Sequence, residues 1–293
     1  MIKPMLCQIA SEPFNDPRYI WENKFDGIRA VAEVNSSGCR LWGRNGREKT
    51  DLFPEIDLKT KAPAVLDGEL VCYTEGKIHF NGIQHRANRV NNIGWASRAY
   101  PATYEVFDIL EAEFKGQKVD LQRLPLMKRK EILEAVLIPT HNVKVAYYTE
   151  DGLGLYQQVE WDQGEGVVGK LKTGTYQQGK REWLKVKVPQ WGEFVICGFT
   201  EGTGWRASTF GALLLGKYDG KDLTYVGSVG TGFNENEIIT LYNKFLTLIT
   251  SICPFGREPE KATWLKPVLV AKIKYLEVTN DGKLRFPSYK GMI

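Results

Sequence analysis

The stretch Glu22-Asn23-Lys24-Phe25-Asp26-Gly27-Ile28-Arg29 decides how this sequence is interpreted. Its Asp-Gly pair is typical of a tight turn, because aspartate can hydrogen-bond nearby backbone and glycine tolerates positive φ. Taken alone, a lysine before such a turn is most simply a solvated hairpin residue. The apolar stretch that follows runs into the turn cluster 35–38 and returns through 39–42, which predicts a hairpin over residues 28–42.

Carboxylates on later strands change this interpretation. Residues 64–73 are predicted to form an apolar strand that carries Asp67 and Glu69. An acidic pair on such a strand is costly unless it meets a cation or a metal ion. Asp67 also has a purely structural explanation, because half-buried strand carboxylates often serve packing alone. Another carboxylate, Glu165, precedes a further short strand.

A pair of lysines points to an anionic ligand. Polar and apolar side chains alternate over residues 183–188, so Lys185 and Lys187 lie on one face of the predicted strand. Two adjacent ammonium groups repel each other unless an anion neutralises both. Phosphate is the obvious candidate.

Composition is that of a folded, water-soluble protein. The 293 residues are 43% hydrophobic and 25% charged, and 39 Lys and Arg against 35 Asp and Glu leave a net charge of +4. This excess permits a polyanionic partner without requiring one. We expect no membrane association, because no apolar run reaches about 18 residues and the N-terminus lacks a secretory signal. The five scattered cysteines favour a reducing compartment.

Patterning predicts two domains, 1–189 and 190–293, joined at the Pro/Gly break of residues 188–192. In the first domain, residues 104–110 form another predicted strand and 78–98 are polar and poorly patterned. Helices are expected over 124–137 and 153–159.

The second domain combines short strands, Gly-rich turns and one helix, the size and content of an OB-type barrel. Its strands are predicted over 193–200, 210–218, 223–229 and 268–278. The helix is predicted over 235–249, with Asn234 as N-cap and Glu237 completing a capping box. Its expected apolar face consists of Ile238, Ile239, Tyr242, Phe245, Leu246 and Ile249.

Five motifs in order, Lys-x-Asp-Gly-x-Arg, Asp-Gly-Glu, a strand with an aromatic residue, Glu-Gly-Val-Val and Lys-x-Lys, resemble those of the covalent nucleotidyltransferases. This superfamily comprises polynucleotide ligases and mRNA capping enzymes. Segments 80–86, 124–130 and 286–291 are similar to bacterial and viral ATP-dependent DNA ligases of the minimal two-domain type. The resemblance, which extends from about residue 4 to 290, implies an α+β fold. An antiparallel-sheet adenylation (nucleotidyltransferase) domain would precede a C-terminal OB-fold β-barrel.

The same resemblance implies a reaction. In this family a lysine takes AMP from ATP, AMP passes to the 5′-phosphate of a nick, and the 3′-hydroxyl then displaces AMP. The expected cofactors are ATP as AMP donor and Mg²⁺ (or Mn²⁺). The expected partner is nicked duplex DNA, bound by a monomer in a bacterial cytoplasm or a virus-infected cell.

Position in the motifs implies individual roles, with Lys24 as the nucleophile. Binding of ATP or AMP is implied for Glu22, Lys24, Arg29, Glu69, Phe107, Lys185 and Lys187. Within this set, Glu22 would accept a hydrogen bond from the adenine amino group and Phe107 would stack on adenine. A position in the core explains Phe107 equally well on pattern alone. Metal binding is implied for Glu165 and Glu69, and binding of the nick 5′-phosphate for Arg44.

Three alternatives stay open: an RNA ligase, a capping-type guanylyltransferase, and a non-catalytic OB module. A Walker P-loop is excluded, because no Gly-Lys pair precedes Ser or Thr. The family usually has an Arg-x-Asp-Lys motif after the 286–291 segment, where it contacts pyrophosphate. This sequence ends at Ile293 without it, so either the terminus has been removed or Lys290 or Arg285 substitutes.

Overall fold

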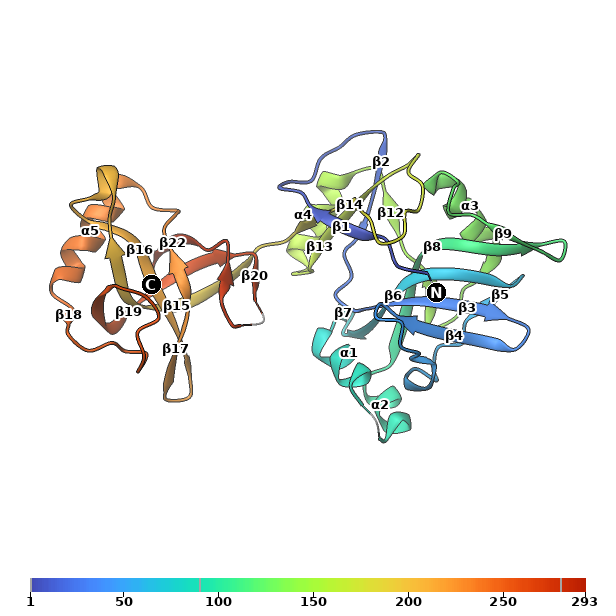
Figure 1. The fold of residues 1–293 in the computed structure, drawn as a ribbon, viewed down its shortest axis with the longest axis horizontal. Coiled ribbons are helices and arrows are strands. Elements are labelled where there is room, and N and C mark those ends of the chain that lie inside the picture. The colour runs from blue at the N-terminus through green and yellow to red at the C-terminus, as the bar shows by residue number, and fades with distance from the viewer. Residues whose placement is uncertain (1, 90, 280) are drawn as a thin grey trace. The chain divides into compact units, whose positions relative to one another are not determined.

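The chain folds into two compact α+β units (Figure 1). The computed structural model describes residues 2–89, 91–279 and 281–293. Unit 1 ends at Val188 and unit 2 begins at Pro189. No helix in these described ranges is long and apolar enough to cross a membrane.

Unit 1 contains a large sheet with the strand order β11-β8-β6-β3-β4, in which β7 also pairs with β6 and β9 with β8. These strands are β3 (Ile28–Asn35), β4 (Gly38–Gly43), β6 (Ala64–Thr74), β7 (Lys77–Ile78), β8 (Ala102–Phe114), β9 (Gln117–Asp120) and β11 (Val143–Val145). The predicted hairpin is confirmed as β3 and β4, which pair antiparallel. The strands predicted over 64–73 and 104–110 are confirmed as β6 and β8.

A second sheet of unit 1 has the order β1-β14-β13-β2-β12. Its strands are β1 (Leu6–Ile9), β2 (Tyr19–Asn23), β12 (Tyr148–Thr149), β13 (Gly166–Leu171) and β14 (Arg181–Lys187). A small pair consists of β5 (Lys59–Thr60) and β10 (Leu137–Ile138). The helical elements of unit 1 are η1 (Thr50–Leu52), α1 (Phe80–Ala87), α2 (Ile93–Ala99), α3 (Leu126–Val136) and α4 (Gly152–Trp161).

The stretch quoted first is the crossover between these two sheets. The chain leaves the smaller sheet at Asn23, the end of β2, and enters the larger one at Ile28, the start of β3. Gly27 lies against β6 so closely that a Cβ there would meet the Leu70 carbonyl oxygen at 2.3 Å. Only glycine therefore allows the crossover to follow β6, and this path places Lys24 between the sheets.

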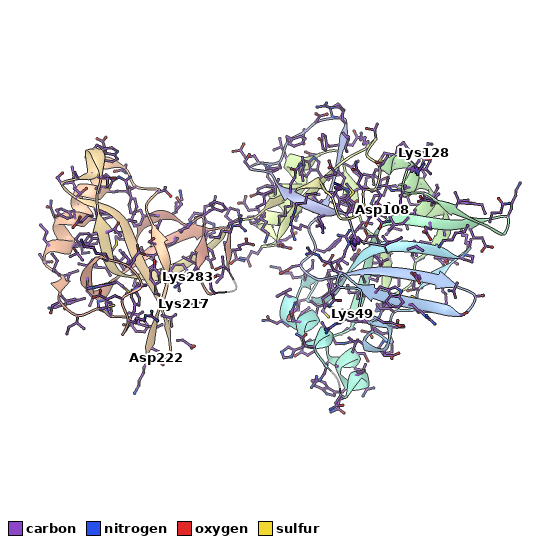
Figure 2. The ribbon with its side chains drawn as sticks, in the orientation of Figure 1. Lys49, Asp108, Lys128, Lys217, Asp222 and Lys283 are labelled. Carbon is purple, nitrogen blue, oxygen red and sulfur yellow. The ribbon has the colours of Figure 1, made fainter. Side chains whose placement is uncertain are left out.

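Apolar side chains from both sheets form one buried cluster around the crossover. Val65 and Phe107 come from the larger sheet, and Val168 and Trp183 from the smaller one. The helices predicted over 124–137 and 153–159 are confirmed as α3 and α4. Figure 2 shows that α3 carries Lys128 at the surface of unit 1, whereas Asp108 on β8 is fully buried.

The poorly patterned segment 78–98 contains the two short helices α1 and α2. They bury few apolar residues, among them Ile83 and Ala96, and they also bury the charged residue Arg86. Hydrophobic periodicity therefore could not indicate these helices, because part of their inner face is a guanidinium group.

Unit 2 is built on a sheet with the order β17-β16-β15-β19-β18, with β22 paired to β19. The strands of unit 2, within and outside this sheet, are β15 (Gln190–Glu201), β16 (Phe210–Asp219), β17 (Asp222–Val229), β18 (Ile249–Thr250), β19 (Thr263–Tyr275), β20 (Glu277–Val278), β21 (Leu284–Arg285) and β22 (Ser288–Met292). Its helical elements are η2 (Gly204–Arg206) and α5 (Glu235–Leu246).

The capping box of α5 is confirmed, because Asn234 and Glu237 exchange both side-chain to backbone hydrogen bonds. Part of the expected apolar face was wrong. Ile239 and Leu246 are 55% and 50% exposed. The helix ends at Leu246, so that Ile249 belongs to β18 and is also exposed. The residues buried along α5 are Ile238, Leu241 and Phe245, which follow helical spacing.

Candidate active site

Lys24 and Glu165 meet between the two sheets of unit 1. The Lys24 Nζ lies 2.6 Å from Oε2 of Glu165, and the two side chains are only 20% and 18% exposed. The Lys24 backbone N–H donates to the Gly166 carbonyl at 2.8 Å, so the crossover is tied to the start of β13. Two motifs that are 141 residues apart therefore share one ion pair.

Glu165 also holds a second lysine. Lys187 Nζ lies 3.1 Å from its other oxygen, Oε1. The antiparallel pairing of β13 with β14 places Gly166 opposite Lys187 and Val168 opposite Lys185. One carboxylate is thus shared by two ammonium groups, and Lys185 lies two residues before Lys187 on the same strand.

Arg29 is held by Asp67. Its guanidinium donates to both Asp67 oxygens at 2.6 Å, and the Tyr176 hydroxyl donates to Asp67 at 2.6 Å. Asp67 is fully buried, and the guanidinium carbon of Arg29 lies 4.5 Å from the centre of the Phe107 ring. Asp67 therefore positions Arg29 over Phe107.

Glu69 lies beside Asp67 on β6, and burial raises its pKa to about 8, although Arg29 and Lys24 oppose the shift. Burial, together with the charge of Glu165, also raises the pKa of Asp26. Both raised pKa values mean that these carboxyl groups favour their neutral, protonated form, because the site is poorly solvated.

Glu22 is buried between two lysines that sequence reasoning did not assign to the site. Its Oε1 lies 2.5 Å from Nζ of Lys130 on α3, and its Oε2 lies 2.7 Å from Nζ of Lys170 on β13. All three side chains are at most 2% exposed. Although burial alone would raise the pKa of Glu22, the two lysines hold it below its usual value. Burial lowers the pKa of Lys170, and Glu22 opposes that shift.

The Lys170 ammonium also lies 4.2 Å from the centre of the Phe107 ring and 4.1 Å from that of Trp183. Phe107 is 5% exposed and therefore belongs to the core, as the alternative explanation from the sequence required. Its ring nevertheless contacts two cations of the site, Arg29 and Lys170.

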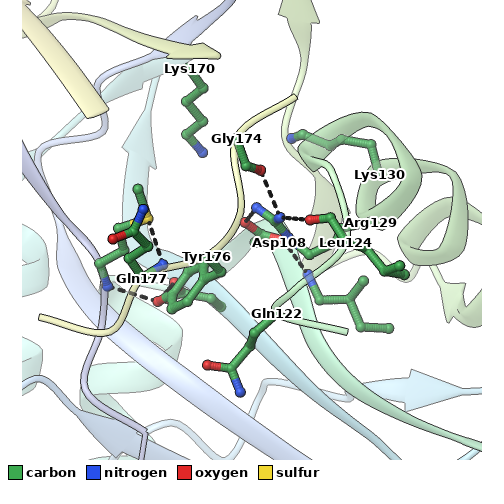
Figure 3. Close-up of polar contacts among 12 residues, drawn as sticks. Asp108, Gln122, Leu124, Arg129, Lys130, Lys170, Gly174, Tyr176 and Gln177 are labelled. Carbon is green, nitrogen blue, oxygen red and sulfur yellow. Dashed lines mark hydrogen bonds and ion pairs between the residues drawn. The ribbon is translucent and has the colours of Figure 1, made fainter. Parts of the chain in front are cut away.

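Helix α3 is fixed by a second buried ion pair, shown in Figure 3. Arg129 donates to the two Asp108 oxygens at 2.7 and 2.9 Å, and to the carbonyls of Leu124 and Gly174 at 2.6 and 3.0 Å. These bonds join α3 to β8 and to the segment that leads to Tyr176. They thereby place the neighbouring Lys130 against Glu22.

Arg44 directly follows Gly43, the last residue of β4, which pairs with Ala30 next to Arg29. It is exposed in the tight turn after β4, where the Gly46 N–H donates to the Gly43 carbonyl at 2.8 Å. No hydrogen bond or ion pair in the described part of the chain joins Arg44 to Lys24 or Glu165.

Comparison with known families gives this site a context. Residues 4–187 match the ATP dependent DNA ligase domain, and residues 206–292 match the ATP dependent DNA ligase C terminal region. The chain therefore belongs to the ATP-dependent DNA ligase family, which confirms the resemblance seen in the motifs. The nucleotidyltransferase domain is confirmed as well, and the sheet of unit 2 is consistent with the predicted OB fold.

Individual relatives differ in length. The multifunctional non-homologous end joining protein LigD of Mycolicibacterium smegmatis is 33% identical over 99% of this chain, but the match covers only 38% of that protein. The SPbeta prophage-derived DNA ligase-like protein LigB of Bacillus subtilis is 29% identical, and the match covers 99% of this chain and 98% of that protein. The crystal structure of the ligase domain of M. tuberculosis LigD is 28% identical, with a TM-score of 0.57 over 100% of this chain and 95% of that one.

The buried pair of Arg29 and Asp67 leads to a first prediction. Asp67→Asn leaves the Arg29 charge without its partner, and breaking a buried pair in this way costs about 3–5 kcal/mol. We expect the free energy of unfolding of unit 1, measured by urea denaturation, to fall by an amount in this range. The matched control is Glu111→Gln, which breaks the ion pair with the 72% exposed Lys118 and should cost at most about 1 kcal/mol. Equal losses for the two variants would contradict the role of Asp67.

Glu69 leads to a second prediction. Because its pKa is about 8 in the folded protein and 4.5 without the fold, the folded state binds the proton more tightly. The stabilisation is fully present below pH 4.5 and is lost as the pH rises through about 8. Without nucleotide or metal, the melting temperature of Glu69→Gln should therefore gain on that of the wild type across this interval. A constant difference would show that Glu69 is ionised throughout.

Proposed function

We propose that this chain seals nicks in duplex DNA, with Lys24 as the residue that carries AMP. The observation that supports this proposal most directly is the pairing of Lys24 and Lys187 with the single carboxylate of Glu165. A merely structural ion pair needs one cation. A second ammonium group beside the first suits a site in which phosphate oxygens arrive.

In the first step, the Lys24 amine attacks the α-phosphorus of ATP. A phosphorus–nitrogen bond forms, the bond to pyrophosphate breaks, and the amine loses its proton. A lysine ammonium is not a nucleophile, so one proton must leave the nitrogen before the attack, and a second leaves to solvent once the phosphorus–nitrogen bond has formed. The Glu165 oxygen 2.6 Å from Nζ is placed to accept the first of these protons, and Lys185 and Lys187 can stabilise charge on the phosphate.

The adenosine would lie beside Arg29, Glu69 and Phe107, with Glu22 at the amino group. A mycobacterial DNA ligase D that is 28% identical to this chain, with a TM-score of 0.56, is described as a complex with ATP and MES, which supports ATP as the nucleotide. In the present structure Arg29 and Lys170 contact the Phe107 ring. Stacking of adenine on that ring therefore requires these cations to move.

Glu165 and Glu69 fit a divalent cation such as Mg²⁺, which prefers carboxylate and phosphate oxygens and keeps several waters. The structure contains no cluster of three or more His, Cys, Asp or Glu side chains within its described ranges that could hold a metal alone. A site completed by ATP phosphates is consistent with this. A bound Mg²⁺ would offset the charge that develops on the phosphates and would favour the neutral form of the nearby amine.

In the later steps, AMP passes from Lys24 to the 5′-phosphate of the nick, and the 3′-hydroxyl attacks that phosphate and releases AMP. Arg44 would bind the 5′-phosphate, because a guanidinium group can donate two parallel hydrogen bonds to phosphate oxygens. Its exposed turn leaves it accessible to DNA. We further propose that the protein acts as a monomer.

Substitution of the nucleophile tests the proposal. Lys24→Ala should abolish acid-labile attachment of AMP from ATP and ATP-dependent sealing. It should still seal a nick that already carries a 5′-adenylate, at a reduced rate, because that step does not need the amine. Gel assays with labelled ATP and both nicked substrates make the comparison.

The matched control is Lys59→Ala, which removes an ammonium group that is 58% exposed and paired with Asp57. It should leave both reactions unchanged. Full ATP-dependent sealing by Lys24→Ala would overturn the covalent mechanism. Attachment of label from GTP in place of ATP would favour a capping-type guanylyltransferase, and a preference for nicks in RNA would favour an RNA ligase.

A further inference from the structure

The segment that contains α1 and α2 lacks acidic residues. No Asp or Glu occurs from residue 76 to 104, whereas the same segment contains Lys77, Arg86, Arg89 and Arg98. A run of this length is unusual in a chain in which acidic and basic residues nearly balance. We call α1, α2 and the connection between them, residues 80–99, the helical pair.

Arg86 anchors the helical pair. It is 1% exposed, and its guanidinium donates to the Glu55 oxygens at 2.5 and 3.0 Å and to the Tyr100 carbonyl at 3.0 Å. It also donates to the Leu52 carbonyl. Arg86 thereby neutralises the charge of Glu55, and these contacts attach the helical pair to the rest of unit 1.

The outer face of the helical pair combines an exposed indole with cations. Trp95 is 52% exposed, and the guanidinium carbon of Arg89 lies 4.7 Å from the centre of its ring. Tyr100 contacts Trp95 edge to face, and the His85 ring stacks on Tyr100. Arg98 is exposed on the same helix as Trp95. These aromatic contacts hold the Arg89 and Trp95 side chains in a defined arrangement.

The helical pair lies close to the proposed reaction centre along β6. The His79 N–H, just before α1, donates to the Cys72 carbonyl of β6 at 2.8 Å, and α1 packs on that strand. Cys72 is three residues beyond Glu69, which corresponds to about 10 Å along a strand.

We propose that the outer face formed by Arg89, Trp95 and Arg98 binds the phosphate backbone of duplex DNA beside the nick. This inference rests on the proposed function. The absence of acidic residues matches the negative charge of DNA, and arginine contacts to phosphate position a protein on the duplex without reading its sequence. The indole, apolar on its faces and polar at N–H, suits the adjoining sugar.

The experiment measures binding to a nicked duplex that lacks the 3′-hydroxyl and cannot be sealed, over about 50 to 200 mM salt. Each phosphate contact contributes about 0.9 to the slope of log K against log salt concentration, so Arg89→Gln with Arg98→Gln should reduce that slope by about 2. Trp95→Ala should weaken binding at every salt concentration and leave the slope unchanged.

A gain of charge provides a test that does not depend on loss of fold. Asn91 is exposed between the two helices, and Asn91→Lys should steepen the slope by about 1. The matched control for the double variant is Arg123→Gln with Lys128→Gln, which removes two exposed cations beside α3. In Figure 1 α3 lies at the opposite end of unit 1 from α1 and α2, so this control should change the slope much less.

Attachment of AMP from ATP is measured on the same preparations. If the wild type forms no lysyl–AMP, the proposed function fails whatever the binding data show. If the wild type is adenylylated but the helical-pair variants keep the wild-type slope, or lose no more of it than the α3 control, the inference about this surface is overturned.

Discussion

Glu165 is the counter-ion on which the site depends. It holds Lys24 from the crossover and Lys187 from β14, and so it ties the smaller sheet of unit 1 to the point where the chain leaves that sheet. The crossover can reach that point because Gly27 lies flat against β6. A side chain there would displace Lys24 from the carboxylate. The position of the proposed nucleophile thus follows from one close backbone contact and one shared carboxylate.

The same arrangement occurs a second time in unit 1. Glu22 also lies between two lysines, Lys130 and Lys170, and this group is almost completely buried. Burying such charges costs solvation that the ion pairs only partly return, so they are poor devices for stability alone. Each group carries one more positive than negative charge. Around Glu165, where the phosphates would bind, this surplus suits an anionic nucleotide, and it is hidden in the small net charge of the whole chain.

The motifs predicted which residues would meet, because their order matches a known family and their chemistry has one common purpose. Lys24, Glu165 and Lys187 do lie together. The contribution of Lys130 could not be predicted, since it reaches Glu22 only through the packing of α3 on β8. The helical pair was missed for a related reason: its anchor, Arg86, is charged, and hydrophobic patterning detects only apolar faces. The roles of all the site residues, Lys24 and Glu165 as well as Arg44 and Phe107, stay predictions.

The most direct measurement of the central claim is to find which residue carries the nucleotide. The protein is incubated with ATP and Mg²⁺, digested under conditions that preserve phosphoramidates, and analysed by mass spectrometry for a peptide with added AMP. The account predicts the adduct on Lys24, on the peptide that spans the crossover. An adduct on Lys185 or Lys187 with Lys24 unmodified would contradict it.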